Sequence, residues 1–142
     1  MSEHFGGAEA LTLKQRPDGK PWKFMIVDDS EFMIKNLSRI IVSFGGDVVN
    51  MAHDGDEAVK MFTENQANID LITMDITMPR MNGIAALEEI MKINAQARVV
   101  VVSALGHQEL VKQALLHGAR HYIVKPFQRE NVFRVFDQIL SD

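Results

Sequence analysis

The sequence contains no cysteine, which excludes both a disulfide framework and thiolate metal sites. It also has no apolar run near the roughly 18 residues that a membrane span needs. Residues 1–7 include neither a basic nor an apolar stretch, so no secretory signal is visible. We therefore expect a cytoplasmic protein without membrane insertion.

Basic residues are scarce as well. Lysine and arginine together number 15 against 19 aspartates and glutamates, which gives a net charge of −4. A surface that binds nucleic acid would need a basic stripe, so we expect no nucleic-acid partner. The chain of 142 residues has the size of one domain, and that length suffices to bury a core.

The first part of the chain differs in composition from the rest. It is rich in glycine and polar residues, and it ends in a run of turn-forming residues, 16–21. One interpretation is a flexible extension over residues 1–22 that precedes a domain over residues 23–142. The alternative is that Leu11, Leu13 and Trp22 attach this segment to the domain or to a partner.

From residue 23 onward, short apolar runs alternate with helical patterns. The Val/Ile-rich runs are unbroken, which is typical of parallel strands covered on both faces. Right-handed crossovers then predict an α/β fold, a doubly wound parallel sheet of five strands and five helices. The strands are expected at 24–27, 47–52, 71–74, 98–102 and 121–124, and the helices at 32–44, 55–65, 84–93, 107–117 and 129–140.

Polar residues follow the strands where each one ends. Asp28 and Asp29 follow the first strand, Asp75 the third, Ser103 the fourth and Lys125 the fifth. Taken singly, each could be a helix cap, a turn residue or a surface charge. In a doubly wound sheet, however, ligands bind at the carboxyl ends of the strands. Because four chain segments deliver such groups to one edge, we expect a site there.

The chemistry of this set indicates phosphoryl transfer. Three neighbouring carboxylates repel one another unless a cation joins them. Oxygen ligands without histidine or cysteine suit Mg²⁺. An aspartate can attack phosphorus as a nucleophile, and an ammonium and a hydroxyl can neutralise the charge of the transferred group.

Four motifs carry a resemblance to a known family. They are Val27-Asp28-Asp29-Ser30, the segment from Met74 to Gly83, Val102-Ser103-Ala104, and the segment from Tyr122 to Phe127. Together they resemble the receiver domain of two-component response regulators over residues 23–142. Since no output domain is attached, the chain is most similar to CheY-type single-domain regulators of chemotaxis. This resemblance implies the strand order 2-1-3-4-5.

The resemblance also implies roles for the site residues. Asp75 would be phosphorylated by a CheA-like histidine kinase. Asp29 and Asp75 would bind Mg²⁺ directly, Asp28 would hold a metal-bound water, and the backbone carbonyl of Thr77 would complete the coordination.

The remaining roles concern the switch. Ser103 would move its hydroxyl to the phosphoryl group, and Tyr122 would then swing inward. Lys125 would pair with the phosphoryl group, and its bond to Pro126 would be cis.

The surface expected to change is formed by residues 107–117, 121–124 and 129–140. It would bind an effector or a flagellar motor switch protein, and a phosphatase is a further candidate partner. We expect a monomer that catalyses its own phosphorylation and dephosphorylation and is not otherwise an enzyme. An alternative is a relay that passes phosphate to a histidine phosphotransfer protein. The candidate exposed positions on this surface are Gln108, Val111, Lys112, Tyr122 and Arg134.

Three other functions fit the sequence less well. In a flavodoxin-like protein, the acidic segment 28–31 would repel the FMN phosphate. A haloacid-dehalogenase-type phosphatase needs an acid two residues after its nucleophile, where this chain has Thr77. His117 and His121 could suggest a metal site, but Gly118 ends the helix between them.

Overall fold

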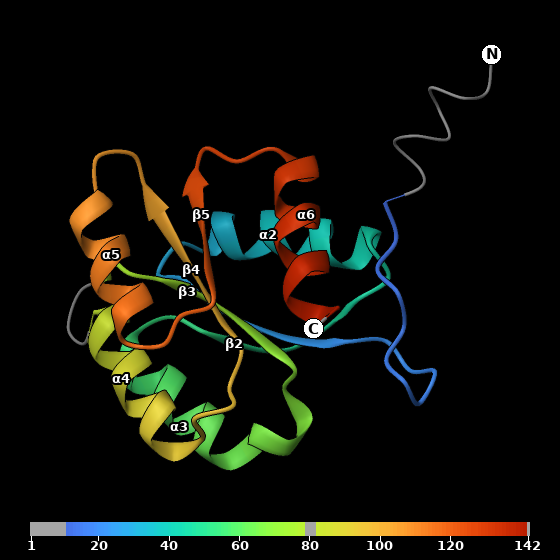
Figure 1. Ribbon diagram of the computed structural model, residues 1–142, viewed down its shortest axis with the longest axis horizontal. Helices are drawn as coiled ribbons and strands as arrows, with labels where there is room; N and C mark the ends of the chain where they lie inside the picture. Colours follow the sequence, from blue (N-terminus) through green and yellow to red (C-terminus); the bar gives the residue numbers. More distant parts are fainter. Residues whose placement is uncertain (1–10, 79–81, 142) are drawn as a thin grey trace.

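The computed structural model describes residues 11–78 and 82–141. Its centre is a parallel sheet of five strands in the order β2-β1-β3-β4-β5, which confirms the expected order (Figure 1). All the neighbouring strands pair in parallel, so their carboxyl ends meet at one edge. The strands are β1 (Lys23–Val27), β2 (Asp47–Ala52), β3 (Leu71–Asp75), β4 (Val99–Ala104) and β5 (His121–Lys125).

Helices cover both faces of the sheet, as the doubly wound prediction requires (Figure 1). One face is covered by α2 (Glu31–Ser43) and α6 (Arg129–Leu140). The other is covered by α3 (Gly55–Asn65), α4 (Gly83–Ile93) and α5 (Gln108–Leu116). The part of the chain that the structure describes contains no helix long and apolar enough to cross a membrane.

Polar side chains begin three of these helices. The Ser30 hydroxyl accepts a hydrogen bond from the Met33 N–H, and the Asp54 carboxylate accepts one from the Glu57 N–H. The Asn82 side chain does the same for α4. Each bond satisfies a backbone N–H that the first helical turn leaves without a partner. The predicted start of α3 at Asp54 is thus confirmed.

Two apolar residues do not lie where the sequence pattern placed them. Val111, on α5, was expected to be exposed. It is only 9% exposed and packs into the core cluster that includes residues of α4 and α5. Phe32 was counted in the apolar pattern of α2, yet it is 74% exposed. Helical periodicity identifies an apolar face, but packing of the neighbouring elements determines where that face ends.

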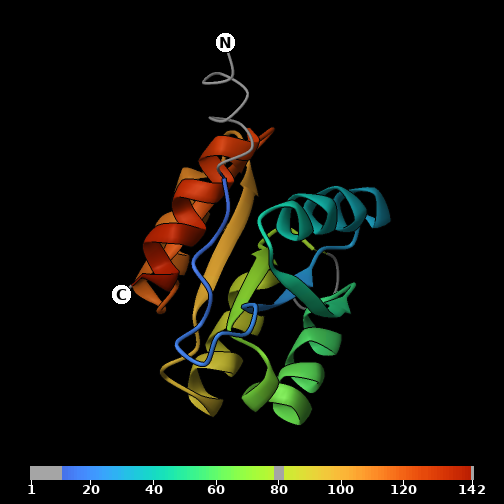
Figure 2. The same ribbon diagram turned by 90° about the vertical axis from the view of Figure 1, so that its right-hand side faces the viewer.

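Residues 11–22 pack against the domain, as the alternative interpretation of this segment proposed. Leu13 is buried beside α2 and α6, and its N–H donates to the Phe44 carbonyl at 2.9 Å. Trp22 Nε1 donates to the Lys14 carbonyl at 2.6 Å. Figure 2 shows the segment running alongside α6. The contacts of Leu11, Leu13 and Trp22 support the alternative interpretation for these residues, and residues 1–10 lie outside the described residues.

The amino end of the sheet holds this segment through charge as well. Arg16 Nη1 lies 3.4 Å from Asp70 Oδ2, and the same oxygen accepts a hydrogen bond from the Lys23 N–H at 2.8 Å. The Arg98 guanidinium lies 5.6 Å from the centre of the Trp22 ring. Asp70 thus joins the N-terminal segment to the start of β1.

Replacing Leu13 by alanine should lower the free energy of unfolding by about 2–4 kcal/mol, because the change leaves a cavity beside Phe44 and α6. Urea denaturation measures this loss. Thr12→Ala is the control, since Thr12 is exposed and should change the free energy by less than about 0.5 kcal/mol. Equal stability of Leu13→Ala and the wild type would contradict the packing of this segment.

Candidate functional site

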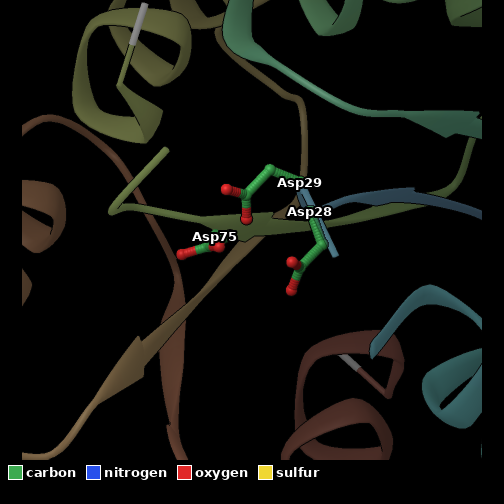
Figure 3. Close-up of side chains that lie close together, drawn as sticks. All are labelled: Asp28, Asp29 and Asp75. Carbon is green, nitrogen blue, oxygen red and sulfur yellow. The ribbon is translucent and has the colours of Figure 1, made fainter. Parts of the chain in front are cut away.

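Three aspartates gather at the carboxyl edge of the sheet (Figure 3). Asp28 follows β1 directly and Asp75 is the last residue of β3, the neighbouring strand. One carboxylate oxygen from each of Asp28, Asp29 and Asp75 lies within 4.8 Å of the others. Asp28 and Asp75 are buried, while Asp29 is exposed. The structure therefore brings together the three acids that the sequence assigned to one site.

Local hydrogen bonds orient the two buried carboxylates. Asp28 Oδ1 accepts from the Ser30 N–H at 2.9 Å. Asp75 Oδ1 accepts from both the N–H and the hydroxyl of Thr77, each at 3.0 Å. The bond from the Thr77 hydroxyl was not anticipated, because the resemblance assigned this residue a role through its backbone carbonyl. That role of the carbonyl stays a prediction.

Gly83 belongs to the site for a steric reason. A β-carbon at this position would overlap the backbone carbonyl of Asp75, so no larger residue could begin α4 this close to β3. The start of α4 can thus approach Asp75. The preceding residues of the motif, 79–81, lie outside the described residues.

Lys125 supplies the positive charge. Its Nζ lies 3.1 Å from Asp28 Oδ2 and 3.7 Å from Asp75 Oδ2. The ammonium comes from the end of β5 and its side chain is 23% exposed. The peptide bond between Lys125 and Pro126 is cis, as the resemblance implied.

The pKa of Asp28 reflects its burial and, to a smaller extent, the charge of Asp75. Burial raises the pKa of this carboxyl above its usual range, and the neighbouring Asp75 raises it further. The Ser30 N–H and the Lys125 ammonium act in the opposite direction without cancelling these effects. A nearby cation would relieve this destabilisation of the charged form.

The residues fit a hard divalent cation such as Mg²⁺. The aspartates offer oxygen ligands alone, and two of them are already oriented by backbone N–H groups. Among the described residues this is the one cluster of three or more histidines, cysteines or acids close enough to share an ion. His117 instead pairs with Glu88 at 3.3 Å, and His121 contacts the backbone of Tyr122.

Ser103 and Tyr122 lie on the α5 side of the site. Ser103 is completely buried at the end of β4, and its hydroxyl donates to the Ala104 carbonyl at 2.9 Å. Tyr122 is 41% exposed on β5. Both residues line a cavity of about 270 Å³ whose wall also includes Leu105, Val111 and Val124. An open space therefore lies between the hydroxyl and the aromatic ring.

A cluster of His53, Glu31 and Glu57 was not predicted from the sequence. His53 Nε2 lies 2.6 Å from Glu31 Oε1, and its Nδ1 lies 3.0 Å from Glu57 Oε1. The imidazole thus links the first turns of α2 and α3. Hydrogen bonds to Glu31 and Glu57 raise the pKa of His53. The three residues are far apart in the chain except for the i, i+4 pair, so no local pattern indicates the cluster.

The fold and this site define a doubly wound α/β domain with an acidic, metal-compatible site at its strand ends. The chain belongs to the response regulator receiver domain family, whose model matches residues 24–137. It is a receiver domain of the two-component type.

Individual relatives agree with this family. The chain is 46% identical over 127 residues to the chemotaxis protein CheY of Treponema pallidum, covering 89% of this chain and 88% of that protein. It is 44% identical over 119 residues to CheY of Bacillus subtilis, covering 84% and 98%. Among solved structures it is similar to the CheX-CheY-BeF₃-Mg complex of Borrelia burgdorferi. The TM-score is 0.83 and the identity 43%, over 86% of this chain and 91% of that one.

The link through His53 should stabilise the protein at low pH in particular. Because its folded pKa is raised, the contribution is complete below the pKa of unfolded histidine, about 6.5. It is lost as the pH rises through the folded pKa. We therefore expect His53→Gln to lower the free energy of unfolding more at pH ~5.5 than at pH ~9.

Urea denaturation of both proteins at the two pH values measures this difference. His107→Gln is the control, because the His107 side chain makes no capping hydrogen bond at the start of α5. A loss of stability in His53→Gln that is the same at both pH values would show that the ion pairs do not contribute.

Proposed function

We propose that Asp75 accepts a phosphoryl group from the histidine kinase of a chemotaxis two-component system. The observation that carries this proposal is the position of its buried carboxylate, which lies beside the other two acids and 3.7 Å from the Lys125 ammonium. The CheY relatives favour chemotaxis as the setting. The relay alternative has no comparable support.

In the reaction, an oxygen of Asp75 attacks the phosphorus of a phosphohistidine. The new O–P bond forms as the P–N bond breaks, and the imidazole leaves with the electron pair of that bond. Lys125, which lies beside the Asp75 carboxylate, pairs with the phosphoryl oxygens. Attack of water on the phosphorus then breaks the O–P bond to Asp75, which releases inorganic phosphate and returns the carboxylate. The protein would thus catalyse its own modification and its reversal, and would turn over no other substrate.

Asp28, Asp29, Asp75 and the carbonyl of Thr77 would hold Mg²⁺. When bound, Mg²⁺ neutralises charge on the carboxylates and on the transferred phosphoryl group. The protein's own contribution is orientation. The Ser30 N–H and the Thr77 N–H and hydroxyl hold two of the carboxylates in place before the metal arrives.

The phosphoryl group would act as a ligand for the switch. Its oxygens offer Ser103 a partner other than the Ala104 carbonyl that the hydroxyl binds now. Movement of this loop would let the Tyr122 ring enter the neighbouring cavity of about 270 Å³. The ring and the cavity wall belong to the face formed by α5, β5 and α6. The shape of this face would therefore change.

This face would bind the partners. Gln108, Lys112 and Arg134 are exposed there and could contact an effector or a flagellar motor switch protein. The Borrelia relative forms a complex with CheX, which shows that a similar domain binds a protein partner. A phosphatase acting at the site is a further candidate partner. We infer a cytoplasmic monomer. We also infer that it binds no nucleic acid, since its net charge is −4.

Incubation with a small phosphodonor and Mg²⁺ should add the mass of one phosphoryl group to the intact protein. Asp75→Asn should abolish this adduct while the circular dichroism spectrum stays that of a folded protein. Asp56→Asn is the matched control, because Asp56 is exposed in the first turn of α3 and should not affect the adduct. An adduct that persists in Asp75→Asn would contradict the proposed acceptor.

Mg²⁺ should stabilise the unphosphorylated protein, because it binds the folded site and relieves the repulsion of the carboxylates. At a concentration 100 times the dissociation constant, the free energy of unfolding should rise by about 2.7 kcal/mol. Asp29→Asn removes one ligand at an exposed position and should lose most of this gain. The same gain in the wild type and in the variant would place the ion elsewhere.

A further inference from the structure

The side chain of His121 lies against Tyr122, the residue next to it on β5. Their ring centres are 5.6 Å apart, with 43° between the ring planes. The Tyr122 N–H donates to His121 Nδ1 at 2.8 Å. His121 therefore contacts both the backbone and the ring of the residue that is expected to move.

The hydrogen bond lies on β5, a strand at the edge of the sheet. This strand lies at one end of the sheet, next to β4. An edge strand leaves some backbone N–H groups without a neighbouring strand to bind. His121 Nδ1 supplies an acceptor at Tyr122, and the bond keeps the imidazole close to the strand.

The ring of Tyr122 has few other contacts that would hold it. It is 41% exposed, and its hydroxyl makes no hydrogen bond within the described ranges, 11–78 and 82–141. On its other side lies the cavity of about 270 Å³ that also borders Ser103 and Val124. The ring thus has two places to occupy: outward against His121, where it lies here, or inward in the cavity.

We propose that His121 is a positioning residue that holds Tyr122 in the outward orientation and so sets the resting balance of the switch. This inference rests on the proposed function, in which the inward orientation accompanies phosphorylation. The ring contact exists in the outward orientation and is lost when Tyr122 turns inward. A contact present in one of two states shifts the equilibrium toward that state.

The sequence makes this equilibrium measurable, because Tyr122 is the single tyrosine of the chain. Isotope labelling of tyrosine therefore gives NMR signals from one ring, without ambiguity of assignment. Nuclear Overhauser contacts to Val111 and Val124 report the inward orientation, and contacts to residue 121 report the outward one.

The variants separate the two contacts that His121 makes. His121→Ala removes both the ring and the acceptor, while His121→Phe keeps a ring and removes the acceptor. We expect His121→Ala to raise the inward-to-outward ratio about two- to tenfold, the range for loss of a ring–ring contact. His121→Phe should restore most of the wild-type ratio. His117→Ala, an exposed histidine at the end of α5, is the control and should leave the ratio unchanged.

These measurements are made without phosphorylation, so they test the inference by themselves. An unchanged ratio in His121→Ala, or an equal rise in His121→Phe, would overturn the role of the ring contact. Urea denaturation of each variant shows that the ratio is measured on folded protein.

A separate measurement tests the proposed function. Beryllofluoride with Mg²⁺, which imitates the phosphoryl group, should move the wild-type ring inward. Failure of that movement would contradict the switch in the proposed function, whatever the His121 variants show. The two failures are therefore distinguishable.

Discussion

Repulsion among three carboxylates is the constraint on which the site depends. Parallel strands place Asp28 and Asp75 at the same edge, because β1 and β3 are neighbours in the sheet. Burial makes their charges costly, and the raised pKa of Asp28 shows that the cost is only partly offset. Lys125, which comes from β5, offsets part of it by approaching both acids. A sheet edge with this charge is suited to bind a divalent cation and, with it, a phosphoryl group.

The same groups connect the acid site to the surface. Lys125 ends β5, the strand that also carries Tyr122, and Ser103 is the second-last residue of the neighbouring strand β4. In the proposed switch, a change of charge at Asp75 would act on residues of the two strands that lead to the α5 face. α6 is held in place by apolar packing. Leu13 and the aromatic residues Phe44 and Phe136 join that helix to the N-terminal segment and to α2.

Much of the fold could be predicted because its signals are local. Apolar runs, helical periodicity and capping residues such as Asp54 lie within a few residues of the elements they specify. The errors arise where distant segments meet. Val111 was placed on the surface, although it belongs to a buried cluster. The sequence left open whether Leu13 is flexible or attached, and packing beside α2 and α6 decided for attachment. The His53 cluster joins two helices, so no local pattern could indicate it.

The sequence by itself determined the alternation of strands and helices and the polar residues that end each strand. It also determined that these residues share one edge, because the carboxyl ends of parallel strands all lie at the same edge of a sheet. The order of the strands within the sheet came from the family resemblance. The tertiary structure alone decided that Lys125 approaches Asp28 more closely than Asp75, that Tyr122 lies outward against His121, and that Leu13 is buried. These features depend on contacts between side chains from separate elements, whose positions are set by the packing of the whole domain.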